Sequence, residues 1–104
     1  MNATRRLGPA VKAEVTADYN ALMHTRIAEH QGTALVFTTS LHDLESWFLT
    51  LGGRITHQTA GPGITLWSLH TDTDHGEGAP VTVHALALDT DQIDGDIADA
   101  VTAA

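Results

Sequence analysis

The sequence predicts an α+β domain: a four-stranded, mainly antiparallel sheet with helices packed on it. Apolar side chains recur at helical spacing in some segments and form short β-branched runs in others. Glycine and proline separate these segments, as they do between helices and strands. A length of 104 residues fits one domain, so we expect the order α-β-α-β-β-β-α over residues 1–104, with 1–10 as a flexible tail.

The first helix is predicted from about Thr16 to Gln31. Its side chains at i, i+3, i+4, i+7, i+8 and i+11 share one helical face: Tyr19, Leu22, Met23, Arg26, Ile27 and His30. Gly32 suits the left-handed position that ends a helix. Residues 33–39 follow as a strand, because they are β-branched and aromatic, and their unbroken apolar run favours cover on both faces.

The second helix is predicted over residues 41–51. Ser40 and Asp43 have the spacing of a capping box, in which the first residue caps the helix N-terminus. One face is apolar and carries Leu41, Leu44, Trp47, Phe48 and Leu51. Leu49 lies off this face, and the pair Gly52-Gly53 ends the helix.

The second half of the chain is predicted to supply three strands and a final helix. The strands are expected at 54–59, 64–70 and 81–88, with a turn at 60–63 and a polar loop at 71–79. The apolar set of the last strand changes phase, which predicts either a bulge near His84-Ala85 or burial on both faces. Residues 91–102 carry Ile93, Ile97 and Val101 at helical spacing.

Charge and composition exclude several classes of protein. The net charge is −8, and residues 55–104 hold the whole excess because they contain no lysine or arginine. A nucleic-acid binder normally shows a basic footprint, so nucleic acid is not an expected partner. The chain has no cysteine and no apolar run of the ~20 residues that cross a membrane, so neither disulfides nor a membrane are expected. No leader pattern opens the sequence, and we expect a cytoplasmic protein.

Seven histidines raise the question of a metal site. The candidates for ligand or metal binding lie on predicted strands and in the polar loop: His57, His70, Asp72, Asp74, His75 and His84. Imidazole and carboxylate groups bind zinc and other divalent ions, and two strand histidines would share a pocket if His57 paired with His70 across the 60–63 turn. The alternative is that the loop is only a solvated polar segment, and no cofactor is then needed.

Support for catalysis is lacking. The serines lie outside the motif GxSxG, and no glycine-rich phosphate-binding motif occurs. Ser40 already has a structural role as a helix cap. Asp72 and Asp74 lack the apolar setting that would raise a carboxyl pKa for acid catalysis. Trp47 and Trp67 are expected to be core residues.

The predicted unit of strand, helix and three strands contains the segment Asp43-Leu-Glu-Ser-Trp-Phe-Leu-Thr-Leu51-Gly-Gly-Arg54. This unit resembles the βαβββ module of the vicinal oxygen chelate (glyoxalase and bleomycin-resistance) superfamily. The resemblance implies that two modules pair around a cupped site, which often holds a divalent metal, so one module per chain implies a homodimer. Ligands in that family usually come from the first and last strands; here the last strand has His84 and the first offers only Thr33, Thr38 and Thr39.

Three functions remain open at this point. The first is a small non-enzymatic binding or regulatory module that acts through a protein interface as a homodimer, with Leu49, Trp67 and Leu69 as interface candidates. The second is a small-molecule- or metal-binding protein of the vicinal oxygen chelate type. The third is an acidic mimic of nucleic acid from a phage or mobile element. One lysine among many arginines and threonines suggests a GC-rich genome, such as that of an actinobacterium or its phage.

Overall fold

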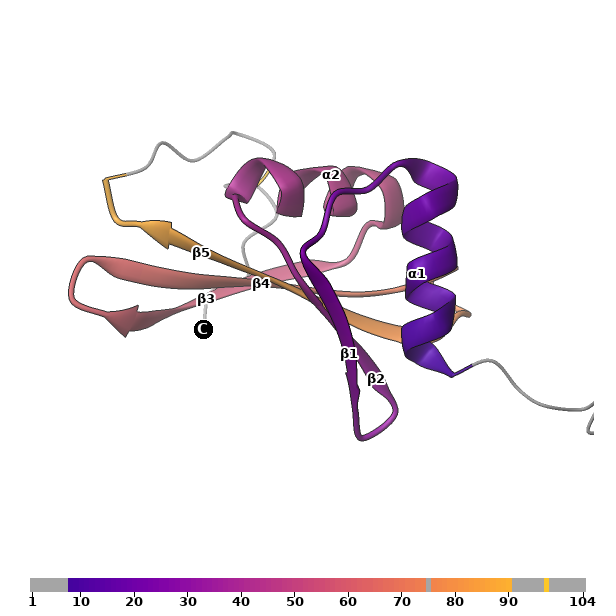
Figure 1. The fold of residues 1–104 in the computed structure, drawn as a ribbon. Coiled ribbons are helices and arrows are strands. Elements are labelled where there is room, and N and C mark those ends of the chain that lie inside the picture. Colours follow the sequence, from indigo (N-terminus) through magenta and orange to yellow (C-terminus); the bar gives the residue numbers. More distant parts are fainter. Residues whose placement is uncertain (1–7, 75, 91–96, 98–104) are drawn as a thin grey trace, which may run out of the picture.

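The computed structural model describes residues 8–74, 76–90 and 97. Its helices are α1 (Pro9–Asn20) and α2 (Leu41–Leu51). Its strands are β1 (Arg26–His30), β2 (Thr33–Phe37), β3 (Arg54–Gly61), β4 (Ile64–Asp72) and β5 (Pro80–Leu88). Both helices lie on one side of the sheet (Figure 1), which confirms the predicted α+β class.

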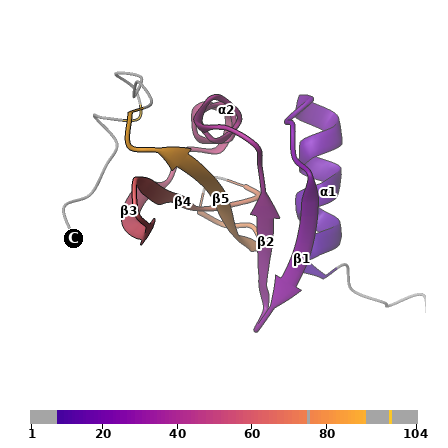
Figure 2. The ribbon, with the colours of Figure 1, turned by 60° about the vertical axis from the view of Figure 1, so that its left-hand side comes forward.

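Helix α1 packs on the sheet through small side chains. It begins at Pro9, whose fixed φ suits the first helical position. Ala13 and Ala17 lie one turn apart and are fully buried, which lets the helix approach closely to β1 and β2 (Figure 2). The helix ends where Ala21 adopts a left-handed conformation with φ of 54°.

The predicted helix from Thr16 to Gln31 is wrong beyond Asn20, because β1 occupies residues 26–30. Tyr19 is 89% exposed and Met23 is 66% exposed, so the apolar stripe that predicted the helix is not a buried face. Ile27 instead pairs with Val36 across an antiparallel hairpin. Its turn is Gln31-Gly32, where both residues have positive φ (51° and 81°), the conformation of a two-residue hairpin turn.

The sheet has five strands in the order β1-β2-β5-β4-β3, where we expected four. The pair β2–β5 is parallel, and the other three neighbouring pairs are antiparallel. The additional strand is β1, which forms one edge. Helix α2 provides the crossover that a parallel connection requires, since it follows β2 and packs on β4 and β5.

Helix α2 agrees with its prediction at both ends. The Ser40 hydroxyl accepts a hydrogen bond from the Asp43 backbone N–H at 3.2 Å, which confirms the cap. Leu44, Trp47 and Leu51 are buried. The Trp47 indole Nε1–H donates to the Met23 carbonyl at 3.0 Å, so the largest core side chain is also hydrogen-bonded.

Both predictions for strand β5 are wrong, because the strand has no bulge and only one of its faces is buried. Its register against β4 is continuous from Pro80 to Leu88, and burial alternates along the strand. The buried set is Val81, Val83, Ala85 and Ala87, while the two leucines face the other way. The register shift in the described sheet lies instead in β3, between Thr59 and Gly61.

The core lies between the helices and one face of the sheet. Its largest members include Trp47, Leu44, Ile55, Leu69 and Val36. Trp67 is 7% exposed and Leu69 is 0% exposed, so both are core residues within the single chain. They therefore offer no surface to a partner, and their selection as interface candidates is corrected. Leu49, the third candidate, is 63% exposed on α2.

The remaining predictions fall at the ends of the chain. The final helix over 91–102 lies outside the described residues, except for Ile97, which is fully buried. Of the expected tail over 1–10, the structure describes residues 8–10, and α1 includes Pro9 and Ala10. Among the described residues, no helix has both the length and the apolar character needed to span a membrane.

Candidate functional site

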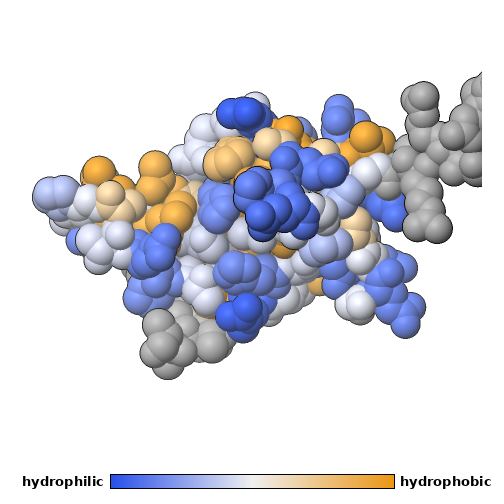
Figure 3. Space-filling model, turned by 90° about the horizontal axis from the view of Figure 1, so that it is seen from below, coloured by the Kyte–Doolittle hydropathy of each residue, from blue (hydrophilic) through white to orange (hydrophobic). Residues whose placement is uncertain are grey.

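The face of the sheet opposite α1 and α2, called the uncovered face because no described helix lies on it, carries apolar side chains. Alternation along β2, β4 and β5 places these residues on it: Leu35, Phe37, Ile64, Leu66, Leu86 and Leu88. Leu86 and Leu88 are each 58% exposed. Figure 3 views this face, where hydrophobic side chains gather toward one end of the sheet. A solvated sheet face is usually polar, so a contiguous apolar area on it marks a candidate binding surface.

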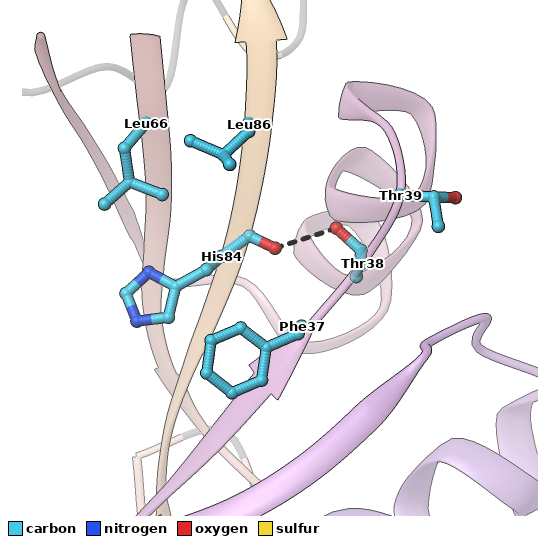
Figure 4. Close-up of a pocket in the computed structure, with 6 residues that line it drawn as sticks. All are labelled: Phe37, Thr38, Thr39, Leu66, His84 and Leu86. Carbon is cyan, nitrogen blue, oxygen red and sulfur yellow. Dashed lines mark hydrogen bonds between the residues drawn. The ribbon is translucent and has the colours of Figure 1, made fainter. Parts of the chain in front are cut away.

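A cavity of about 420 Å³ opens on this face. It is lined by Phe37, Thr38, Thr39, Leu66, His84 and Leu86. Figure 4 shows Leu66 and Leu86 lying side by side above His84, with the Phe37 ring below and Thr39 pointing away. The lining is therefore mostly apolar with one imidazole at its side, a composition typical of small-molecule sites.

The wall formed by β2 is fixed by hydrogen bonds beyond the end of that strand. The Thr38 backbone N–H and its hydroxyl both donate to the His84 carbonyl oxygen, at 3.0 Å and 2.9 Å. These bonds continue the β2–β5 pairing by one residue. The Phe37 and His84 rings lie next to each other at a centroid distance of 5.7 Å, and together they form one part of the cavity wall.

A second cavity of about 390 Å³ adjoins the first, because Leu66 and His84 line both. Its other lining residues are Thr56, His57, Gln58, Ser68 and His70. Here each of two imidazoles is paired with a hydroxyl group. The Ser68 hydroxyl and His84 Nδ1 share a hydrogen bond at 3.0 Å, and so do the Thr56 hydroxyl and His70 Nε2.

Both imidazoles have a reduced tendency to become charged. Burial lowers the pKa of His84, and the neighbouring His70 lowers it further. Burial also lowers the pKa of His70, with a further contribution from the positive charge of Arg54. At neutral pH both rings are therefore neutral, and each can donate one hydrogen bond and accept another.

His57 does not pair with His70 as the sequence suggested. The register between β3 and β4 pairs His57 with Trp67 and His70 with Arg54. The His57 ring lies against the Trp67 indole at a centroid distance of 4.9 Å. Alternation directs the side chains of His70 and His84 to the uncovered face and that of Trp67 to the opposite face. His70 and His84 therefore present their rings to the uncovered face, while His57 lines the second cavity from the edge strand β3.

One candidate ligand of the polar loop, Asp72, has a structural role. One carboxylate oxygen of Asp72 accepts hydrogen bonds from the backbone N–H groups of Asp74 (2.7 Å) and Gly78 (3.3 Å), and so shapes the loop between β4 and β5. Asp74 is exposed, and His75 lies outside the described residues. Within residues 8–74, 76–90 and 97, no three histidine or carboxylate side chains are grouped as metal ligands would be.

Sequence reasoning missed the apolar walls of the site. The sequence predicts cover on both faces of the strand that carries Phe37, and it predicts a bulge or burial on both faces for the strand that carries Leu86 and Leu88. A signal was present, since valine and alanine alternate along β5 with leucines that belong to the other face. An antiparallel strand with apolar residues on both faces indicates that something beyond the helices covers its second face.

Comparisons with protein-family models, with curated proteins and with solved structures gave no match to this chain.

Proposed function

We propose that this protein binds a small, largely apolar molecule on the uncovered face of its sheet. The observation that carries the proposal is the cavity of about 420 Å³ between Phe37, Leu66 and Leu86. Its volume lies within the range of small-molecule sites, which is roughly 300–1,000 Å³. Such sites combine apolar walls with a few polar groups that orient the ligand, and here the His84 imidazole supplies such a group.

The order of elements is consistent with this proposal. Strand β2, helix α2 and strands β3 to β5 follow one another as strand, helix and three strands, the order on which the resemblance to the vicinal oxygen chelate superfamily rests. That resemblance implies a cupped site between two modules. We propose that the uncovered face is this chain's half of such a site, and that binding there needs no metal ion.

The direct test is a comparison of two leucine variants. Leu86 and Leu88 are equally exposed on the same strand and face, but only Leu86 lines the cavity. Leu86→Glu places a charge in the apolar cavity, whereas Leu88→Glu adds the same charge outside it. Ligand-observed NMR with single-ring aromatic fragments measures the effect.

We expect fragments to bind the wild-type protein and the Leu88→Glu variant, with about tenfold weaker binding or more to Leu86→Glu. If no fragment binds the wild type, or both variants bind equally well, the proposed cavity is not a ligand site.

A second candidate function is favoured by the exposure of Leu88. We propose that a second copy of the chain covers the apolar end of this face, because two-fold symmetry would bring the leucines of one copy against those of the other. This contact is separate from the cavity of about 420 Å³, which is lined by residues of one chain. This candidate keeps the homodimer of the sequence analysis but moves its interface from Trp67 and Leu69 to Leu86 and Leu88.

Light scattering after size exclusion tests the dimer. Leu88→Glu is expected to yield a monomer, whereas the matched variant Val15→Glu, at a side chain 57% exposed on α1, is expected to remain dimeric. A third variant, Leu49→Glu, examines the helix side. A monomeric wild type removes the dimer, and dissociation by Leu49→Glu or Val15→Glu alone places the interface on the helices.

A further inference from the structure

The uncovered face is basic although the protein is acidic overall. Arg26 lies opposite Phe37 in the β1–β2 pair, and Arg54 lies opposite His70 in the β3–β4 pair. Residues directly opposite one another in an antiparallel pair point to the same face, so both arginines belong to the uncovered one. Among the described strands, the acidic residue on this face is Asp72, whose carboxylate already accepts two backbone hydrogen bonds.

Three neighbouring hollows lie across this face, and their lining changes from polar at one end to apolar at the other. Arg54 and His70 line one hollow, His70 and His84 line the next, and His84 lines the apolar cavity with Phe37. Neither of the two cavities that share His84 is lined by an aspartate or glutamate. A ligand that spans both cavities therefore meets apolar walls at one end and hydrogen-bond donors at the other.

The donors at the polar end are suited to an anion. His84 uses Nδ1 for Ser68, and its Nε2 has no hydrogen-bond partner among the described residues. His70 uses Nε2 for Thr56, and Arg54 adds a permanent positive charge beside it. An imidazole N–H or a guanidinium forms its strongest hydrogen bonds with an ionised oxygen group such as a carboxylate.

We infer that the ligand is a small amphipathic carboxylic acid, with its apolar body between Phe37, Leu66 and Leu86 and its carboxylate beside His84 and His70. This inference rests on the proposed function and specifies its ligand class. Arg54 sets the charge at the polar end. A neutral apolar molecule would fill the same walls but would leave the Arg54 guanidinium without an ionic partner and the imidazole N–H without a charged acceptor.

A matched pair of probes tests the inference. 4-Phenylbutyrate and 4-phenylbutyramide share one apolar body and differ in the charge of the head group. Isothermal titration at pH 7 is expected to give about tenfold tighter binding of the acid to the wild-type protein. If the amide binds as tightly as the acid, the inference is overturned and the apolar site stands; if neither binds, the proposed function fails.

Variants locate the head group. Arg54→Gln and His84→Asn are expected to reduce the preference for the acid by about threefold or more, and asparagine can keep the hydrogen bond to Ser68. Lys12→Gln removes the same charge from α1, and His42→Asn changes an exposed imidazole on α2; both should leave the preference unchanged. An acid preference that survives Arg54→Gln and His84→Asn would place the carboxylate elsewhere and contradict the inference.

Discussion

Gly53 connects α2 to β3 in a conformation that side chains rarely adopt. Its φ is 115°, and an added Cβ would overlap the His70 carbonyl oxygen and come within 2.9 Å of the Thr71 Cβ on β4. Both obstacles belong to a central strand that cannot easily move. Gly53 therefore permits the close approach that places β3 beside β4, and with it Thr56 beside His70.

Replacement of Gly53 should destabilise the fold, because an added Cβ would overlap β4. We expect Gly53→Ala to lower the free energy of unfolding by about 3 kcal/mol or more, through steric overlap and backbone strain. Gly63→Ala is the control, because Gly63 also has positive φ (71°) but has open space where an added Cβ would lie. There the loss should be about 1 kcal/mol, from strain alone. Equal losses in urea titrations would show that the contact with β4 is unimportant.

At the scale of residues, the sequence predicted part of the site. His70 and His84 were chosen for their chemistry, and both line the second cavity. His57 lines the same cavity, but its pairing with Trp67 was not predictable, because it depends on the register of β3 against β4, which includes an irregularity near Gly61 that composition does not reveal. Phe37 and Leu66 were missed because an apolar side chain gives no indication of which face it occupies until the helices are placed.

At the scale of elements, α2 was predictable because its signals are local. A serine cap, an apolar face and a glycine pair all lie within a dozen residues. Strand β1 was not predictable in the same way, because its five residues follow a helix and end in a Gln-Gly turn. Hairpin turns of this kind favour Asn-Gly or Asp-Gly, so Gln31-Gly32 reads equally well as the end of a helix.

The cap of α2 yields a prediction at this scale. Ser40→Ala removes the acceptor for the Asp43 N–H and should lower the free energy of unfolding by about 1 kcal/mol. The Ser46 hydroxyl in the same helix donates to the His42 carbonyl oxygen, an acceptor within the helix. Ser46→Ala should therefore change the free energy of unfolding by only about 0.3 kcal/mol. Equal effects, measured by urea unfolding, would contradict the assigned capping role.

At the scale of the whole molecule, the sheet order depends on contacts that sequence patterns do not encode. The parallel pairing of β2 with β5 joins residues nearly fifty positions apart, such as Val36 and Val83. That pairing places Phe37 beside His84 and so creates the main cavity. The sequence predicted the class of the fold and most strands, but the uncovered face follows from how the strands assemble and from both helices lying on the other side.

Stability should depend on pH through the two histidines of this face. Folding lowers the pKa of His70 and His84, so the unfolded chain binds more protons than the folded one below the ordinary pKa of about 6.5. The free energy of unfolding should therefore fall as the pH decreases below about 6.5, and these two groups should contribute no slope above it. Urea midpoints from pH 8 to 5 measure this effect. The double variant His70→Gln, His84→Asn should show a shallower slope than the control His42→Asn, and an unchanged slope would contradict the assignment.

The central claim is that the uncovered sheet face is the binding surface. Amide chemical-shift mapping during a titration with 4-phenylbutyrate tests it most directly, since every element reports separately. We expect shifts concentrated at Phe37 to Thr39, on β4 around Leu66 and on β5 from His84 to Leu86, with α1 unaffected. Shifts concentrated on α1 and the exposed side of α2, with these strand residues unchanged, would contradict it.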